Sequence, residues 1–159
     1  MIDTVTVAAA DHPSLDRAVD DFIATLRSEQ RFFGPSARTN PKPFPSLIAR
    51  LGRSGGFRIA AMSAGNVIGL VRVDDDGSVS IAVASDQRGR GIGTSLLTTA
   101  LVRAAQLQYG RLVIRSSRRS RAVRRVGERL GCVVVDGDHG RTDVILSVSD
   151  RRRLSLVPA

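Results

Sequence analysis

The residue types with the clearest chemical meaning are glycines and arginines gathered in one short run, R-G-R-G-I-G-T, at positions 88–94. Glycine has no Cβ, so the chain can turn sharply there and a ligand can approach the backbone N–H groups closely. The first turn of a helix leaves four N–H groups without intrahelical partners and carries a partial positive charge. A pyrophosphate would therefore fit this run if a helix begins within it.

The spacing of apolar residues predicts the elements that position this loop. Ile81 and Val83, with small residues around them, are typical of a buried strand. Beyond the loop, apolar residues recur at helical spacing, namely Leu96, Leu97, Leu101, Ala104 and Ala105. The order strand, glycine loop, helix indicates an anion site built from backbone.

Two other phosphate-binding motifs are excluded by their fixed residues. In a dinucleotide fingerprint the third glycine comes later and an acidic residue closes the next strand, whereas here that strand is predicted at Leu112 to Ile114 without one. A P-loop requires Gly-Lys-Ser or Gly-Lys-Thr, and the only lysine of the chain is Lys42.

The loop resembles the signature Gln/Arg-x-x-Gly-x-Gly/Ala of the GNAT superfamily of acyl-CoA-dependent N-acyltransferases, with Arg88, Gly91 and Gly93 at its fixed positions. A following strand, R-L-V-I-R, and a helix over 120–130 that ends in E-R-L-G-C extend the likeness. Cys132 stands where the family has an aromatic residue. Together these features cover about residues 78–148.

This resemblance implies a cosubstrate, acetyl-CoA or another acyl-CoA, and no metal. In the family the loop holds the pyrophosphate, and the strand before it binds the thioester carbonyl and the pantetheine arm. The cofactor-binding residues expected on this basis are Ile81, Ala82, Val83, Arg88, Gly89, Arg90, Gly91, Ile92, Gly93, Thr94 and Ser120. No cluster of His, Cys and Asp has metal-ligand spacing.

The likeness is greatest to the catalytic domain of bacterial Pat-type protein lysine acetyltransferases. It rests on R-F-F-G-P before a proline-rich loop and on Gly127, which stands where many relatives have a tyrosine as acid. Those proteins carry a glutamate as general base early in the signature strand, and Ser78 occupies that position here. A serine cannot take an ammonium proton unaided. Ser120, where relatives have asparagine, is a second departure.

Other candidate bases and nucleophiles have simpler structural explanations. Asp74, Asp75 and Asp76 precede a glycine and are typical of a turn. His12 and His139 lie in turn-like segments. Tyr109 and Cys132 are expected to pack against the core.

Two functions follow from these residues. The first is an N-acyltransferase that moves an acetyl group from acetyl-CoA to a primary amine by direct attack, with Ser78 as the candidate catalytic residue and a small molecule or a protein lysine as acceptor. The second is a non-catalytic acyl-CoA-binding or regulatory domain, which the missing glutamate and tyrosine favour. Homodimerisation is open in either case.

Length and element order predict one domain of mixed α/β class. The 159 residues suffice for one core, with the domain over 1–150 and a basic tail over 151–159. Helices are expected over 14–28 and 45–53, with a loop from residue 31. The order βα(α)βββαβαββ predicts a twisted mixed sheet of about six to seven strands with helices on both faces. The resemblance implies a GNAT fold, in which strands 78–84 and 111–115 splay apart around the acyl group.

The net charge of +9 comes almost entirely from arginine, which permits two explanations. A basic protein can bind nucleic acid, but arginine in place of lysine can also reflect genomic base composition. Eight arginines lie between 111 and 129, where the resemblance places the nucleotide end of the cofactor, and aromatic residues for base stacking are missing there. Cofactor phosphates are therefore favoured over nucleic acid as their partners.

The composition is that of a cytoplasmic protein. No apolar run is long enough to cross a bilayer, and the first residues lack the pattern of a signal peptide. The single cysteine fits a reducing compartment.

Overall fold

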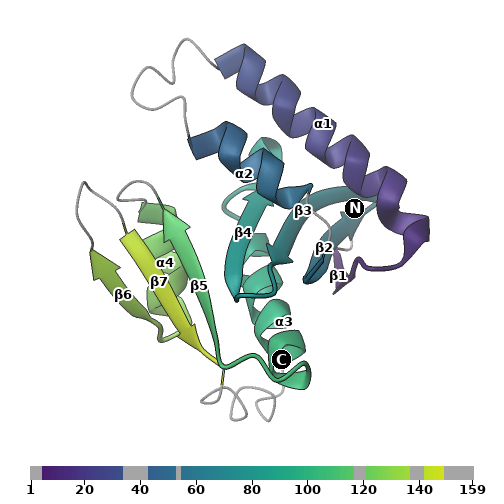
Figure 1. The fold of residues 1–159 in the computed structure, drawn as a ribbon. Helices are drawn as coiled ribbons and strands as arrows, with labels where there is room; N and C mark the ends of the chain where they lie inside the picture. Colours follow the sequence, from purple (N-terminus) through teal and green to yellow (C-terminus); the bar gives the residue numbers. More distant parts are fainter. Residues whose placement is uncertain (1–4, 34–42, 53–54, 117–120, 137–141, 149–159) are drawn as a thin grey trace.

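A seven-stranded sheet is the centre of the computed structural model, which describes residues 5–33, 43–52, 55–116, 121–136 and 142–148 (Figure 1). Its strands are β1 (Thr6–Ala9), β2 (Phe57–Ser63), β3 (Asn66–Val73), β4 (Ser78–Val83), β5 (Arg111–Ser116), β6 (Val133–Asp136) and β7 (Thr142–Ser147). They lie in the order β1-β2-β3-β4-β5-β7-β6, and β4 and β5 form the parallel pair of this otherwise antiparallel sheet. The predicted mixed sheet is confirmed.

Helices cover both faces of the sheet, as predicted. The first two are α1 (Asp16–Phe33) and α2 (Pro43–Leu51), and they pack with one core that includes Ala60 and Leu70. The other two are α3 (Ile92–Gln106) and α4 (Arg121–Arg129). The second core joins α3 to Leu112 and Val144, and α4 contacts β6 and β7 beside it. Among the described residues no helix is long and apolar enough to cross a membrane.

The strand faces follow the alternation of side chains along each strand. In β4, Val79, Ile81 and Val83 point to α3, whereas Ala82 packs with the α1 and α2 core. In β5, Leu112 and Ile114 are buried on the α3 side. Val113 and Arg115 therefore lie on the α2 face.

Most elements begin and end within a few residues of their predicted bounds. The clearest difference is α1, which continues to Phe33 although a loop was predicted from residue 31. The second helix begins at Pro43 and not at 45, because a proline is tolerated in the first turn, where its missing N–H has no intrahelical partner. The proline-rich loop and the tail expected over 151–159 lie outside the described residues.

Candidate functional site

The glycine loop leads directly into α3, as its sequence predicts. Gly91 is the N-cap of the helix and has a left-handed φ of 78°, and Gly89 is also left-handed with a φ of 76°. A Cβ built on either residue would meet no atom within 4 Å. The glycines are therefore not needed for internal packing, and the space beside the loop is open for a ligand.

Three further predicted residues of the loop contribute in different ways. Ile92 is buried in the core, so it can offer a ligand only its backbone N–H. The Arg88 Nε donates to the Val83 carbonyl at 3.4 Å, and an Arg90 Nη donates to the Gln87 side chain. Both arginine side chains are exposed beside the loop, which adds positive charge to the helix N-terminus.

The pairing of β4 with β5 stops soon after it begins. The register joins Ser78 to Val113 and Val79 to Ile114, whereas β4 continues to Val83 and remains paired with β3 along its length. The two strands diverge beyond that point in Figure 1. The edge of β4 that faces β5 is consequently without a strand partner from Ser80 onward.

The direction of each N–H group in β4 follows from two hydrogen bonds. The Ser78 carbonyl accepts from the Asp74 N–H, and the Ala84 N–H donates to the Ile68 carbonyl, so even-numbered residues face β3. Because neighbouring residues in a strand point their N–H groups to opposite sides, Ile81 and Val83 direct theirs toward β5. Ala82 directs its N–H to β3. Of the predicted cofactor-binding residues in β4, Ala82 could therefore contact a cofactor in the gap only through its side chain.

A cavity of about 380 Å³ adjoins the loop on the α3 side of the sheet. It is lined by Gly91, the hydroxyl side chains Thr94, Ser95, Thr98 and Thr99 of α3, and Arg129 at the end of α4. The Thr98 and Thr99 hydroxyls donate to the Thr94 and Ser95 carbonyls, so the donors suited to phosphate are the first helix N–H groups, the other two hydroxyls and one guanidinium. Among the described arginines of the run 111–129, Arg129 is the one that lines this cavity.

A second cavity, of about 190 Å³, lies on the opposite face of the sheet, beneath α2. It is lined by Arg50, Asp74, Asp76, Ser78, Val79, Val113 and Arg115, and we call it the Ser78 cavity. It sits where β4 and β5 are still paired, at the closed end of the gap between them. Ser78 therefore lies on the face opposite α3, at the apex of the diverging strands.

The carboxylates before Ser78 are already engaged in local contacts. Asp76 Oδ1 accepts the Ser78 N–H at 2.9 Å, Asp75 Oδ1 accepts the Gly56 N–H at 3.1 Å, and Asp74 pairs with Arg72 at 3.0 Å. The predicted turn function of these residues is thus supported by their hydrogen bonds. The pKa of Asp76 is lowered by the Ser78 N–H first, then by the Ser78 hydroxyl and by Arg115.

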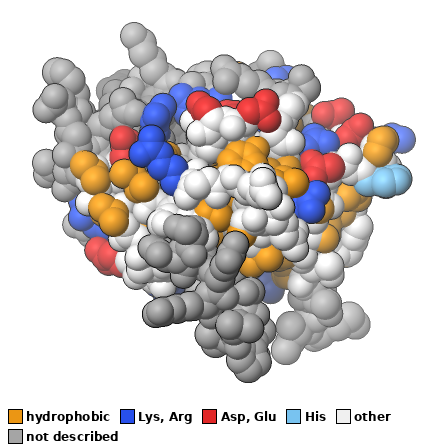
Figure 2. All heavy atoms as spheres, turned by 60° about the horizontal axis from the view of Figure 1, so that its bottom comes forward, with side chains coloured by type: hydrophobic (Ala, Val, Ile, Leu, Met, Phe, Trp, Pro, Cys, Tyr) orange, Lys and Arg blue, Asp and Glu red, His pale blue; other side chains and the backbone are white. Residues whose placement is uncertain are grey.

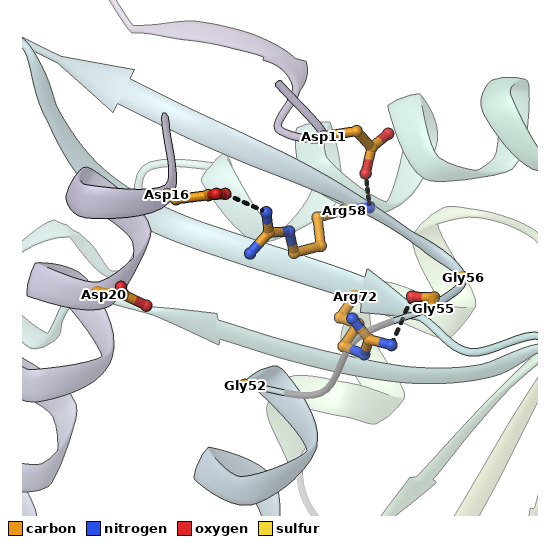
Figure 3. A pocket seen from close by; sticks show the side chains of 8 residues that line it. All are labelled: Asp11, Asp16, Asp20, Gly52, Gly55, Gly56, Arg58 and Arg72. Carbon is orange, nitrogen blue, oxygen red and sulfur yellow. Dashed lines mark hydrogen bonds and ion pairs between the residues drawn. The ribbon is translucent and has the colours of Figure 1, made fainter. Parts of the chain in front are cut away.

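A third cavity, of about 440 Å³, is lined by Arg58 and Arg72 together with acidic residues that include Asp11 and Asp16 (Figure 3). The Arg72 side chain is only 3% exposed and donates to the Gly55 carbonyl as well as to Asp74. Arg58 beside it pairs with Asp16 of α1 at 2.9 Å, and its N–H donates to Asp11. The charged groups of this cavity therefore join α1 to β2 and the Asp74 turn.

Several candidates from the sequence are placed in packing or capping roles. The Tyr109 ring meets Phe57 edge to face with centroids 5.7 Å apart, and burial raises its pKa. The His12 Nδ1 accepts the Ser14 N–H. Cys132 packs half-buried at the edge of the core. Ser120 and His139 lie outside the described residues.

Gly127, at the position of the family's tyrosine, faces the sheet. A Cβ at this residue would lie 3.0 Å from Val144 Cγ1 and 3.2 Å from Val134 Cγ2. The glycine allows α4 to approach β6 and β7 closely. Its small size therefore has a packing reason, independent of any chemistry.

Sequence reasoning missed the two arginines of the Ser78 cavity as site residues. Arg50 reaches the site from α2, and Arg115 had been assigned with its neighbours to the nucleotide end of the cofactor. The alternation in R-L-V-I-R could have shown that Arg115 faces away from the buried Leu112 and Ile114. Within the part of the chain that the structure describes, no group of His, Cys, Asp and Glu could hold a metal.

Comparison with known proteins gives matches to a family and to solved structures. The model of the acetyltransferase (GNAT) family matches residues 21–131. The yncA protein from Salmonella typhimurium, an acetyltransferase by its description and solved with acetyl-CoA, is 18% identical over 91% of this chain and 94% of its own, with a TM-score of 0.62. The paia N-acetyltransferase from Thermoplasma acidophilum, solved with coenzyme A, is 12% identical over 91% and 99%, with a TM-score of 0.63.

A third solved structure matches over a shorter stretch. The cAMP-binding acyltransferase from Mycobacterium smegmatis is 27% identical over 58% of this chain, with a TM-score of 0.48, and the match spans only 30% of that protein's length. A search of curated proteins gave no significant match.

Proposed function

The chain belongs to the GNAT acetyltransferase family, and from this premise we propose that it is an N-acyltransferase that moves an acetyl group from acetyl-CoA to a primary amine. One observation carries the proposal: the glycine loop adjoins a cavity on the α3 face, the Ser78 cavity lies on the α2 face, and β4 between them presents the N–H groups of Ile81 and Val83 to the gap. A cofactor bound from the α3 side and an amine bound from the α2 side would meet there. Direct attack of the amine on the acetyl group requires that the two substrates come together in this way.

The residues of the α3 side fit acyl-CoA as a cosubstrate, which supplies the activated acetyl group. The N–H groups of the loop and the first turn of α3 would hold the pyrophosphate, with Arg129 and the hydroxyls of α3 nearby. The free N–H groups of Ile81 and Val83 would bind the thioester carbonyl. Such preorganised donors stabilise the negative charge that develops on a carbonyl oxygen during acyl transfer.

Proton transfer is the step for which the described residues offer least. Asp76 is the carboxylate beside Ser78, and because its pKa is lowered it stays ionised near neutral pH and is a weak base. We infer that the acceptor amine loses its proton to water and that Asp76 contributes a negative charge to the cavity in which the amine substrate binds. Ser78 then acts by orienting Asp76 rather than by accepting the proton itself.

The alternative is a domain that binds acyl-CoA without turning it over. Its support is that serine replaces the expected base and that Gly127 is required for packing at the position of the expected acid. Both functions predict cofactor binding, and they differ in the release of free CoA. A protein lysine or a small amine remains the acceptor in the catalytic case.

Calorimetry with acetyl-CoA and with acetyl-pantetheine tests the binding step. We expect acetyl-CoA to bind and the analogue without the pyrophosphate to bind much more weakly. Gly91→Val should abolish binding, and Gly65→Val is the matched control, since both glycines have a φ of 78° and open space around them. Equal loss in both variants, or equal affinity for both compounds, would exclude the loop as the anchor.

Release of free thiol from acetyl-CoA in the presence of a panel of primary amines tests the transfer step. A folded protein that binds acetyl-CoA but releases no thiol with any amine is the result expected of the non-catalytic alternative. A protein that acetylates an amine in proportion to the thiol released is the result expected of the transferase.

A further inference from the structure

The Ser78 cavity carries charges of both signs, and its composition identifies a class of acceptor. We propose that the acceptor amine belongs to a free α-amino acid with a terminal side-chain amine, of the lysine and ornithine class. This rests on the transferase function proposed above. Its α-carboxylate would bind Arg50 and Arg115, and its α-ammonium would bind Asp76.

The Ser78 cavity is lined by charges of both signs even when Asp74, which pairs with Arg72, is left out of the count. Asp74 is neutralised by Arg72, whose side chain is buried behind it. The remaining lining charges are Arg50, Arg115 and Asp76, while Asp143, the cross-strand neighbour of Arg115, does not line the cavity. Two guanidinium groups and one carboxylate match a ligand that carries one carboxylate and one ammonium.

Other amines fit this set of charges less well. A polyamine has no anionic group for Arg50 and Arg115 and would be repelled by both. A lysine inside a protein has its α-amino and carboxyl groups in peptide bonds, so it would bring neither a carboxylate to Arg50 and Arg115 nor an α-ammonium to Asp76. The volume of the Ser78 cavity, about 190 Å³, is several times the roughly 30 Å³ that one water molecule takes in the liquid, so the cavity has room for a ligand larger than water.

The spacing along β4 sets the length of the acceptor. The cavity is lined by Ser78 and Val79, and the next N–H group that faces the gap is that of Ile81. Two residues beyond Val79 correspond to about 6.6 Å at roughly 3.3 Å per residue. An α-amine held at Asp76 would be too far from the thioester, whereas the amine at the end of the flexible four-carbon side chain of lysine could reach across that distance.

The transfer balances with the groups named. The side-chain ammonium loses one proton to water, and its nitrogen attacks the acetyl carbonyl carbon. The new C–N bond forms as the C–S bond breaks, the second proton of the nitrogen is released, and the departing thiolate takes up a proton. The net products are the ω-N-acetyl amino acid, free CoA and one proton.

Acceptor analogues test the head-group contacts one at a time. With acetyl-CoA saturating, we expect L-lysine or L-ornithine to be acetylated on the side-chain nitrogen. Cadaverine, which lacks the carboxylate, and Nα-acetyl-lysine, which lacks the α-ammonium, should each have a lower kcat/KM by about 10- to 100-fold, as expected for one lost contact to a charged group. Acetylation of the α-nitrogen, or a preference for cadaverine or a lysine-containing peptide, would overturn the proposal.

Variants of the cavity supply the complementary test. Arg115→Gln and Asp76→Asn should raise the KM for the amino acid by about 10- to 100-fold. Arg111→Gln is the matched control, because Arg111 is exposed on the same strand and face but does not line the cavity. Cofactor affinity by calorimetry should be unchanged in all three. Equal effects of Arg115→Gln and Arg111→Gln would refute the assignment.

The same measurements distinguish a failure of the transferase function from a failure of the acceptor class. Absence of acetyl-CoA binding, or of thiol release with every amine, counts against the transferase function itself. Acetylation of other amines, with free lysine and ornithine ignored, counts against the acceptor class alone.

Discussion

Ser78 and Asp76 behave as one unit because the serine supplies two hydrogen bonds to the carboxylate. The N–H bond is the largest cause of the lowered pKa of Asp76, and the hydroxyl bond is the second. Ser78, the candidate catalytic residue from the sequence, is thus a hydrogen-bond donor to Asp76. The sequence had placed Asp76 in a turn. Any chemical role of Ser78 must therefore be considered together with that of Asp76.

Removal of the hydroxyl should raise the pKa of Asp76. We expect Ser78→Ala to move that pKa partway toward its ordinary value of 3.8, because the N–H bond remains. Titration of the Asp76 carboxyl carbon by NMR measures the change, and Ser80→Ala, two residues along the same strand, is the control. An unchanged pKa in Ser78→Ala would show that the hydroxyl does not bind the carboxylate in solution.

The sign of the effect on stability follows from the direction of the shift. Asp76 has a lowered pKa in the folded state, so its stabilisation is present above the unfolded value near 3.8 and is lost as the pH falls through the folded pKa. The difference in thermal stability between the native protein and Ser78→Ala should therefore be seen at neutral pH and shrink below pH 3.8. Asp76→Asn should abolish that difference.

Gly127→Tyr, which restores the family's acid by residue type, should destabilise the fold instead of adding activity. The Cβ would lie 3.0 Å from Val144 Cγ1, and Val144 is fully buried. Overpacking of this kind costs about 1–3 kcal/mol. Denaturant unfolding measures it, with Glu128→Tyr on the exposed side of α4 as control. Equal stability of the two variants would contradict the packing explanation.

At the scale of elements, the approach of β4 to β5 depends on the glycine just before β4. Gly77 has a φ of 86°, its carbonyl accepts the Val113 N–H, and a Cβ there would lie 2.5 Å from the Arg111 carbonyl oxygen. The glycine brings the two strands together at the apex of the gap. The same strand ends at Val83, at the open end of the gap, and a 3-10 turn over Ser85–Gln87 joins it to the glycine loop.

Gly77→Ala should cost more free energy of unfolding than Gly65→Ala. Both residues are left-handed, with φ values of 86° and 78°, so the backbone strain is similar, but Gly65 has open space around it. The extra cost is expected at about 1–3 kcal/mol, because the backbone of β5 must shift. Chemical denaturation of the two variants checks this, and equal losses would mean that the strands tolerate the added carbon.

At the scale of the whole molecule, the charge of +9 is distributed unevenly. Figure 2 shows acidic and basic side chains interspersed on one face of the described surface. Of the two arginines that line the third cavity, Arg58 pairs with Asp16 and Arg72 pairs with Asp74. These two arginines are therefore compensated by ion pairs within the described residues.

Binding to random DNA should accordingly be weak and should fall steeply as salt is raised. Contacts to phosphates release counterions, so the logarithm of the binding constant declines linearly with the logarithm of the salt concentration. Fluorescence anisotropy from low to physiological salt measures the slope, with acetyl-CoA as a competitor. Sequence-selective binding that persists at physiological salt would overturn the preference for cofactor phosphates.

The sequence by itself determined the local parts of this protein. The apolar alternation before residue 88, the glycines and the helical spacing beyond them are short-range patterns, and they predicted β4, the loop and α3 with nearly correct bounds. The pair Ala64-Gly65 between two apolar runs likewise predicts the turn that joins β2 to β3, and both residues have a positive φ. The GNAT signature lies within these segments, so the family could be recognised from them.

Only the tertiary structure decided which residues share a cavity. Arg50, Ser78 and Arg115 lie on three elements, and they meet because β4 and β5 pair in one parallel register and α2 packs above them. The sequence also could not show that Gly127 faces Val144. A register depends on the packing of both faces of the sheet at once, and no local pattern contains that information.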